Sequence, residues 1–280
     1  MWCTAPSSSS SAVSRQAGWP RSGLGCGPGG HAVADDAPLL EARDIVVAFG
    51  SFRAVDGASL AIRKGEIIGL IGPNGAGKST FFNCLAGERQ PASGSIMLRG
   101  RDVTRASPED HALLGLARSW QVPAVFDDMS VHENVMVGAF LRHPHAAEAA
   151  AAADQVIDFT GLRPVARARS GSLGTPARKR LEIARALATE PEILLLDEAL
   201  AGLTPTEVRA AIDLVRQIHA RGITLVIVEH VMEVILSLAH RAVVFNQGKV
   251  IAQGAPRDVV QDPGVIEAYL GRSLSRKPPA

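Results

Sequence analysis

Apolar residues occur along the chain in short runs whose spacing alternates between that of strands and that of helices. Residues 45–49 and 58–62 are two such runs, separated by turn-forming glycines, and they predict a pair of antiparallel strands in an ordered part that begins near residue 39. A wholly apolar run, Ile67–Ile71, then enters a glycine-rich loop. The following residues, 78–86, lack glycine and proline, which predicts a helix.

The second half of the chain has a strand-helix-strand pattern. Residues 193–196 and 223–228 are apolar runs, and between them Pro205 precedes apolar residues at helical spacing. This alternation predicts a parallel sheet. Residues 242–245 and 250–252 flank an Asn-Gln-Gly-Lys sequence and predict a hairpin. We therefore expect an α/β fold with a mainly parallel sheet, an N-terminal antiparallel β subdomain and a helical insert.

Composition divides the chain of 280 residues into three parts. Residues 1–37 are rich in Ser, Gly, Ala and Pro and lack an apolar signal-peptide core, so we predict a disordered tail; a targeting peptide and an over-long assigned start are the alternatives. Residues 38–273 are predicted to form one folded domain, with a helical subdomain at about 105–170 that contains an alanine-rich stretch. Residues 274–280 are predicted to be a flexible C-terminus.

Charge and cysteine usage exclude several classes of function. Lys plus Arg (29) nearly balances Asp plus Glu (28), so the net charge does not favour binding to nucleic acid or to an acidic membrane. Cys3, Cys26 and Cys84 lack the spacing of metal ligands and are odd in number, which is typical of a reducing cytosol; Cys84 is predicted to be a small core residue. The longest apolar stretch, residues 223–239, carries charged residues that a membrane-spanning helix rarely tolerates.

A glycine-rich sequence between the apolar strand and the following helix matches the phosphate-binding loop, or P-loop, and has the structural context that this motif requires. The matching residues and their neighbour are Gly72, Pro73, Asn74, Gly75, Ala76, Gly77, Lys78, Ser79 and Thr80. Glycines let backbone N–H groups turn toward phosphate oxygens, and the helix N-terminus adds positive charge. We expect Lys78 to approach the β- and γ-phosphates of ATP and Ser79 to bind Mg²⁺.

Two carboxylates end the later apolar strand, where the carboxyl edge of the sheet should meet the P-loop. Asp197 is predicted to hold Mg²⁺, and Glu198 is predicted to orient or deprotonate the attacking water. An acidic pair at this position also commonly caps a helix. Its coincidence with a P-loop favours the catalytic interpretation.

From about residue 39 to 271 the chain resembles the ATP-binding subunit of an ABC transporter. The resemblance rests on the P-loop, on Gln121 after Arg-Ser-Trp, on the sequence Leu-Glu-Ile-Ala-Arg-Ala-Leu at 181–187, and on Glu-His at 229–230. It implies that Gln121 contacts Mg²⁺ and couples the site to membrane subunits, and that His230 acts at the γ-phosphate. An aromatic residue before the P-loop stacks on adenine in this family; Phe49 is the first candidate and Phe52 the second.

Three segments narrow the resemblance toward importers of branched-chain amino acids and their urea or amide relatives: residues 72–87, 201–205 and 262–271. The implied partners are membrane permease subunits, a second and different ATP-binding subunit and, indirectly, a solute-binding protein, at the cytoplasmic face of the inner membrane. Nucleic acid is not an expected partner. The alternatives are a lipopolysaccharide-export ATPase, a soluble ABC ATPase and a low-turnover regulatory subunit.

The sequence departs from this family in its signature loop, which is normally Leu-Ser-Gly-Gly-Gln and here is Leu-Gly-Thr-Pro-Ala at 173–177. The serine that reaches the γ-phosphate of the other subunit is absent, and so is the glutamine. Ala199 and Thr204 replace the usual proline and aspartate near the catalytic glutamate. We expect the altered signature to face the nucleotide of a partner whose own signature completes this chain's site.

Overall fold

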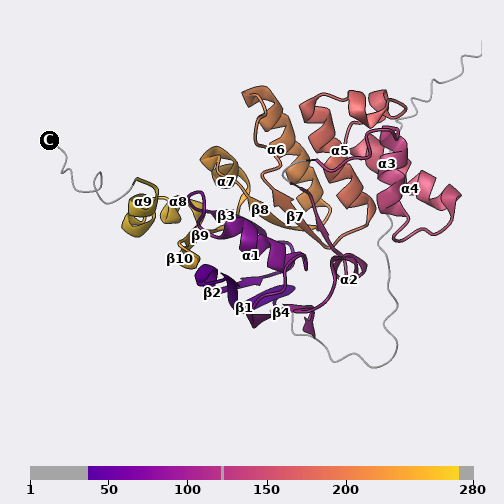
Figure 1. Ribbon diagram of the computed structural model, residues 1–280. Coiled ribbons are helices and arrows are strands. Elements are labelled where there is room, and N and C mark those ends of the chain that lie inside the picture. The colour runs from indigo at the N-terminus through magenta and orange to yellow at the C-terminus, as the bar shows by residue number, and fades with distance from the viewer. Residues whose placement is uncertain (1–36, 121–122, 271–280) are drawn as a thin grey trace, which may run out of the picture. The chain divides into compact units, whose positions relative to one another are not determined.

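The computed structural model describes residues 37–120 and 123–270, which form two β-sheets with helices between and around them (Figure 1). The expected α/β architecture with a P-loop core is confirmed. The predicted tail lies outside the described residues except for Ala37, and so does the predicted flexible C-terminus. The boundaries of the folded domain therefore stay a prediction.

The smaller sheet is antiparallel, with strand order β2-β1-β4-β5. Its strands are β1 (Leu40–Phe49), β2 (Phe52–Ile62), β4 (Ser93–Leu98) and β5 (Arg101–Asp102). Along the end of β2, Leu60 and Ile62 are buried whereas Ser59 and Ala61 are exposed. This alternation places one face of the sheet against the core and the other in water.

The larger sheet has the order β10-β9-β3-β8-β7-β6. It is parallel except for the pair of β9 and β10, which forms the expected hairpin. Its strands are β3 (Ile67–Ile71), β6 (Leu116–Arg118), β7 (Ile193–Asp197), β8 (Thr224–Val228), β9 (Arg241–Asn246) and β10 (Lys249–Gly254). Every residue of β3, β7 and β8 is buried. Such strands are continuous apolar runs because helices cover both faces of the sheet.

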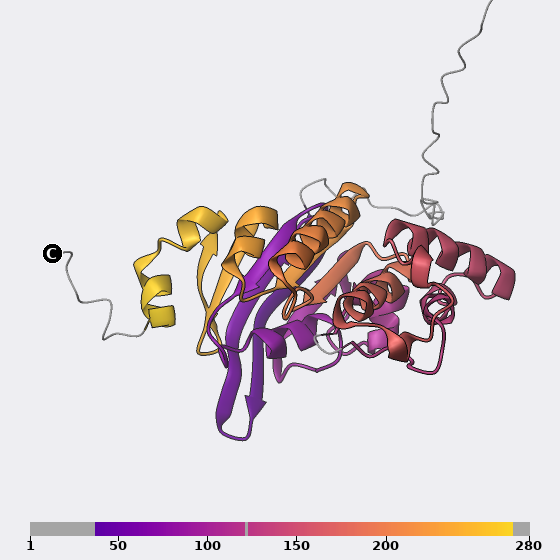
Figure 2. The same ribbon diagram turned by 90° about the horizontal axis from the view of Figure 1, so that it is seen from above.

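Helix α1 (Lys78–Leu85) lies between the two sheets, and helices α6 (Pro205–Ala220) and α7 (Met232–Leu238) lie on the other side of the larger sheet (Figures 1 and 2). Alternate residues of β9 pack against opposite faces of the larger sheet. Val243 and Phe245 pack in the core that contains α1, whereas Ala242 and Val244 pack in the core that contains α7. Cys84 of α1 is buried, as expected.

The helical region contains α2 (Pro108–Leu113), α3 (Val131–Ala139), α4 (Ala146–Phe159) and α5 (Thr175–Ala188), with short 3-10 turns at Arg163–Val165 and Ser170–Ser172. Helices α3, α4 and α5 pack together (Figure 1). The expected helical segment, 105–170, includes β6, which belongs to the larger sheet, and the helical packing continues into α5. Two C-terminal helices, α8 (Pro256–Val259) and α9 (Pro263–Leu270), follow β10.

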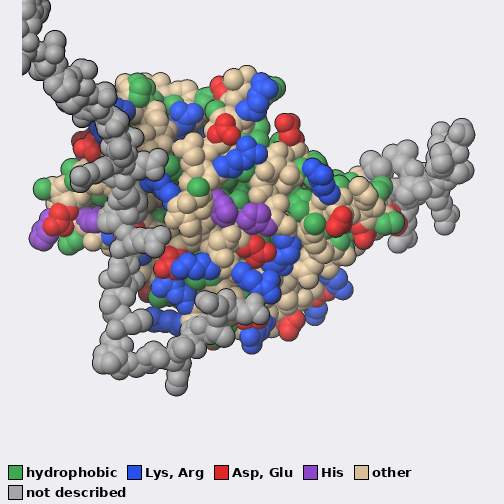
Figure 3. All heavy atoms as spheres, turned by 180° about the vertical axis from the view of Figure 1, so that it is seen from behind, with side chains coloured by type: hydrophobic (Ala, Val, Ile, Leu, Met, Phe, Trp, Pro, Cys, Tyr) green, Lys and Arg blue, Asp and Glu red, His purple; other side chains and the backbone are tan. Residues whose placement is uncertain are grey.

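Within the two described stretches, no helix is both long and apolar enough to cross a bilayer. The face shown in Figure 3 carries Lys and Arg side chains interspersed with Asp and Glu, in agreement with a net charge of +1. Any site for a highly charged anion must therefore be formed locally.

Candidate functional site

The predicted P-loop joins β3 to α1, and its shape depends on close backbone packing. Gly72 has a φ angle of 144°, and a Cβ atom added to it would lie 2.1 Å from the backbone carbonyl oxygen of Phe245. Gly77 has a φ angle of 101°, and a Cβ atom added to it would lie 2.2 Å from the backbone carbonyl oxygen of Ala54. Both positions therefore require glycine. Helix α1 has Gly77 as its N-cap and receives no side-chain cap there. Its N-terminus thus presents backbone N–H groups and partial positive charge at the loop.

Lys78 lies across this loop. Its ammonium group donates hydrogen bonds to the carbonyl oxygens of Gly72, at 2.6 Å, and Pro73, at 3.0 Å. Burial lowers the pKa of Lys78, whereas the nearby charges of Glu198 and Asp197 oppose that shift. The structure thus brings together the lysine and both predicted carboxylates. Ser79 is exposed in the first turn of α1.

Asp197 and Glu198 occupy the carboxyl end of β7, as predicted, but in different environments. Asp197 is buried, and burial raises its pKa although the Arg118 guanidinium opposes the shift. Glu198 has a φ angle of 45°, an unusual conformation for a residue with a side chain. Its carboxylate lies 4.0 Å from the ring of His230, which is the predicted γ-phosphate residue and is largely exposed.

The local donor set fits a magnesium-bound triphosphate. An uncapped helix N-terminus and Lys78 supply positive charge for phosphate, and the Ser79 hydroxyl and Asp197 carboxylate are hard oxygen ligands of the kind that Mg²⁺ prefers. Gln121, the remaining predicted ligand, lies outside the described residues. The assignment of individual ligands stays a prediction.

Glu229 is a buried carboxylate directly before His230. Its Oε1 accepts a hydrogen bond from the backbone N–H of Leu200 at 3.0 Å, and among the described residues its Oε2 has no hydrogen-bond partner. Burial raises the pKa of Glu229. This carboxylate therefore holds the segment that follows Glu198 against the end of β8.

The altered signature segment forms the start of α5. Gly174 is the N-cap, without a side-chain hydrogen bond, and Thr175 is the first helical residue. Pro176 thus occupies the second helical position. Proline is tolerated in the first turn because its missing N–H has no helical partner there. The helix N-terminus is preserved even though the serine hydroxyl is absent.

The two aromatic candidates for adenine stacking lie at the turn between β1 and β2. Phe49 and Phe52 are paired residues of this hairpin. Both are exposed, with relative solvent accessibilities of 47% for Phe49 and 63% for Phe52. The Arg89 guanidinium lies 4.5 Å from the centroid of the Phe49 ring. Exposure leaves either ring available to a base, and neither is part of the core.

Arg118, at the end of β6, is a charged residue whose role the sequence pattern did not indicate. Its guanidinium donates to Asp197 at 2.6 Å, to Asn83 at 2.8 Å and also to Glu88. The sequence shows Arg118 only as part of the segment before Gln121, because the three-residue strand β6 is too short to predict from its pattern.

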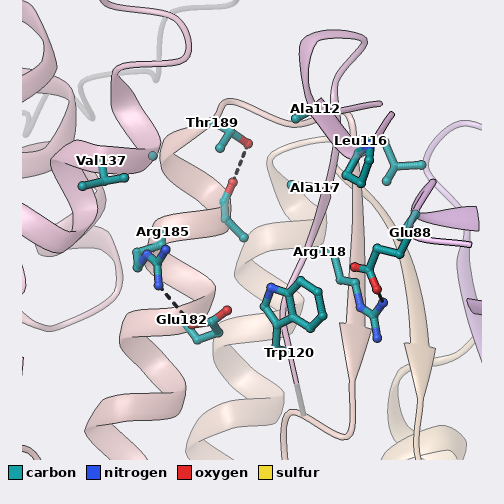
Figure 4. Close-up of a pocket in the computed structure, with 14 residues that line it drawn as sticks. Glu88, Ala112, Leu116, Ala117, Arg118, Trp120, Val137, Glu182, Arg185 and Thr189 are labelled. Carbon is teal, nitrogen blue, oxygen red and sulfur yellow. Dashed lines mark hydrogen bonds and ion pairs between the residues drawn. The ribbon is translucent and has the colours of Figure 1, made fainter. Parts of the chain in front are cut away.

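A cavity of about 240 Å³ adjoins Arg118 (Figure 4). Its polar lining includes Glu88, Arg118 and Trp120, with Glu182 and Arg185 from α5; most of the remaining lining is apolar and comes from α2, β6 and α3. Figure 4 shows the Trp120 ring between Glu182 and Arg118. The cavity is thus lined by the helical region and by Arg118, which in turn donates a hydrogen bond to Asp197.

Comparisons with known proteins find a matching family and relatives that cover most of the chain. Residues 55–201 match the family described as ABC transporter. The chain is 37% identical over 252 residues to the high-affinity branched-chain amino acid transport ATP-binding protein LivG of Salmonella typhimurium, covering 84% of this chain and 99% of that protein. The chain belongs to the ABC transporter family. It is an ATP-binding subunit and an ATPase of that family, as the sequence predicted.

A further relative, a solved structure and a second family match also resemble this ABC ATPase. The lipopolysaccharide export protein LptB of Acidithiobacillus ferridurans is 36% identical over 233 residues, covering 83% of this chain and 97% of that protein. The crystal structure of a nucleotide-free ATP-binding cassette from an ABC transporter superimposes with a TM-score of 0.78 at 30% identity, covering 84% of this chain and all of that one. Residues 249–274 match a family described as branched-chain amino acid ATP-binding cassette transporter.

Proposed function

We propose that this ABC ATPase powers the uptake of branched-chain amino acids or related small solutes. The observation that carries the choice of solute is the match of residues 249–274 to the branched-chain amino acid family. Overall identity does not separate the alternatives, since the LivG and LptB relatives are 37% and 36% identical. The C-terminal match favours amino-acid import over lipopolysaccharide export.

In the proposed reaction the chain's residues bind ATP, position a water molecule and withdraw its proton. The P-loop N–H groups and Lys78 hold the phosphates, and the aromatic ring of Phe49 supports adenine. Ser79, Gln121 and Asp197 would hold Mg²⁺, which when bound neutralises charge on the phosphates. Glu198 acts as the general base toward the attacking water, and His230 lies beside it to contact the γ-phosphate.

The permease partner is proposed to bind around the cavity next to Arg118. Four large apolar side chains near it are exposed: Leu113 of α2, Trp120, Val137 of α3, and Phe140. Two of them, Trp120 and Val137, line the cavity itself. Exposed apolar side chains gathered around a hollow are typical of protein interaction sites. These exposed side chains support the proposal that the chain works at the cytoplasmic face of the membrane, bound to its permease.

The second ATP-binding subunit is proposed to be a different chain. The altered signature at the start of α5 lacks the serine hydroxyl, and the loss of one hydrogen bond to a charged group weakens an interaction by roughly 1.5–3 kcal/mol. A partner with an intact signature would complete the site formed by this chain's P-loop. A low-turnover regulatory role is the competing interpretation, and phosphate release by the assembled complex distinguishes the two.

The test is Glu198→Gln in the complex with permeases and partner subunit. Because the general base is lost, we expect ATP turnover to fall by at least about a hundredfold while calorimetric Mg²⁺-ATP affinity is retained. Glu109→Gln, which changes an exposed carboxylate in α2, is the control and should leave turnover unchanged. Unchanged turnover in Glu198→Gln would refute the proposed catalytic role. Uptake of leucine but not of urea by the reconstituted complex would support the proposed solute class, and the opposite result would reject it.

A further inference from the structure

Arg118 joins the proposed magnesium carboxylate to the wall of the cavity. Through its two terminal nitrogens it contacts Asp197 at the end of β7, Asn83 of α1, and Glu88 just after α1. Asp197 and Arg118 both have little exposed side-chain surface, 5% and 9%. One cation is therefore shared by two carboxylates, of which one belongs to the nucleotide site and the other lines the cavity.

The guanidinium also contacts two aromatic rings. Its central carbon lies 4.7 Å from the centroid of the Trp120 ring and 5.1 Å from that of Phe82. A cation over an aromatic face is attracted by the electron density of the ring, so Trp120 should follow a movement of Arg118. Trp120 is close to half exposed at the cavity, where such a movement would reach a bound partner (Figure 4).

Trp120 is also held from the side of α5. Glu182 of α5 is buried beside this segment; burial raises the pKa of its carboxyl, and the backbone N–H groups of Trp120 and Ala124 oppose that shift. The Arg185 guanidinium donates to the carbonyl oxygen of Ala124 and lies 3.6 Å from Glu182. Helix α5 thus holds the segment that follows Trp120 at Ala124, while the Trp120 ring itself contacts Arg118.

Magnesium binding would change the balance of charges around Arg118. A divalent cation on Asp197 repels the guanidinium and competes with it for carboxylate oxygen. The Glu88 carboxylate remains as a second counter-ion for Arg118 on the side of the cavity. The arrangement thus contains two carboxylate acceptors for one cation, and only one of these carboxylates belongs to the proposed nucleotide site.

We propose that Arg118 is a positioning residue that holds Asp197 before Mg²⁺ arrives and shifts toward Glu88 when Mg²⁺-nucleotide binds, carrying the Trp120 ring with it. This inference rests on the proposed nucleotide function. The resemblance assigns coupling to Gln121 alone, and the inference adds a separate role for Arg118 and Glu88 between the metal site and the cavity. The acceptor exchange is reversible and involves no covalent step.

Trp120 provides a direct readout, because the only other tryptophans are Trp2 and Trp19. The experiment uses the full chain with Trp2→Phe and Trp19→Phe, so that all indole fluorescence comes from Trp120. Mg²⁺ is titrated at a saturating concentration of a non-hydrolysable ATP analogue, and calorimetry of the same samples measures Mg²⁺-analogue binding. We expect a saturable change in Trp120 fluorescence whose midpoint matches the calorimetric one.

Glu88→Gln is the informative variant, because it preserves shape and removes only the second counter-ion. Arg118 is then left to Asp197, so the Mg²⁺ concentration at half-saturation should rise about three- to tenfold, the range expected for one partly buried charged contact. Asp213→Asn, which removes the charge from an exposed ion pair on α6, is the matched control and should leave the midpoint unchanged.

Arg118→Lys tests the shared contacts, since an ammonium group cannot span several acceptors as a planar guanidinium does. We expect the Trp120 signal change to fall by more than half while calorimetric affinity stays within about threefold. The inference would be overturned if Mg²⁺ caused no change in Trp120 fluorescence in the parent protein, or if the Glu88→Gln midpoint equalled that of the parent. Either result would leave the proposed function intact. Calorimetry that detects no Mg²⁺-analogue binding in the parent protein would reject both.

Discussion

The ammonium group of Lys179 in α5 donates a hydrogen bond to the backbone carbonyl oxygen of Glu198, across 3.0 Å. Glu198 is held in a left-handed backbone conformation, with φ of 45°, which costs energy for a residue with a side chain. Its N–H also donates to the carbonyl oxygen of Val228 at 2.9 Å. The helix that begins with the signature segment therefore helps to hold the proposed general base in place.

Lys179→Met should lower turnover of the assembled complex without weakening nucleotide binding. Removing a hydrogen bond from a charged donor costs about 1.5 kcal/mol or more, which predicts a fall in kcat of about tenfold if Glu198 loses its alignment. Steady-state phosphate release gives kcat, and calorimetry gives the Mg²⁺-ATP affinity. Lys64→Met, at an exposed lysine, is the control. A rise in KM with unchanged kcat would contradict the positioning role.

The sequence predicted the parts of this structure whose signals are local. The apolar runs that became β3, β7 and β8 were found because buried parallel strands are continuously hydrophobic. The P-loop was found because its chemistry requires a fixed order of residues within one turn. The antiparallel hairpin of β9 and β10 was found from two apolar runs on either side of an Asn-Gln-Gly-Lys sequence.

What the sequence did not predict depends on contacts between distant segments. Strand β6 has only three residues, and it is stabilised as a strand by pairing with β7, whose paired residues come 77 positions later. Arg118 acquires its partners through that pairing, since Asp197 belongs to the neighbouring strand and Asn83 to α1. Lys179 likewise reaches Glu198 only when α5 packs beside the sheet. Single-residue roles of this kind follow from topology rather than from motif spacing.

Phe49→Ala should weaken ATP binding about tenfold, because stacking of a base on an aromatic ring contributes about 1–3 kcal/mol. Phe52→Ala is the matched control, since it removes a similarly exposed ring from the paired position of the same turn. We expect it to change the affinity by less than about twofold. Calorimetric titration with Mg²⁺-ATP measures both. If Phe52→Ala gives the larger loss, the second candidate is the adenine-binding residue.

Gly174→Ser should raise turnover at the composite site formed with the partner's P-loop. The backbone of Gly174 has φ of −68° and ψ of 163°, which serine adopts readily, and the nearest heavy atom to an added Cβ lies 3.9 Å away. Serine is also a preferred N-cap, although its gain over glycine is only a few tenths of a kcal/mol. Its hydroxyl restores one donor to phosphate, which predicts a rise of about tenfold.

The matched control is Gly174→Ala, which occupies the same space without a hydroxyl. The measurement is phosphate release by the assembled complex in which Glu198→Gln silences this chain's own site, so that only the partner's nucleotide is hydrolysed. Equal turnover in the serine and alanine variants would show that the missing hydroxyl does not limit the reaction.

Glu229→Gln should change the pH dependence of stability. Burial raises the pKa of Glu229 above its ordinary value, so between those two values the native state binds more protons than the unfolded state. The free energy of unfolding is therefore highest below the ordinary pKa and falls as pH rises through the raised one. Glutamine keeps an oxygen for the Leu200 N–H and does not titrate.

The difference in melting temperature, Glu229→Gln minus the parent protein, should thus be larger at pH 8 than at pH 5. A change of ~1 kcal/mol corresponds to roughly 2–4 °C for a chain of this size, so differential scanning calorimetry at the two pH values resolves the effect. Glu109→Gln is again the exposed control and should show no such increase. A difference that is equal at both pH values would mean that the Glu229 carboxyl is as readily ionised in the native state as in the unfolded chain.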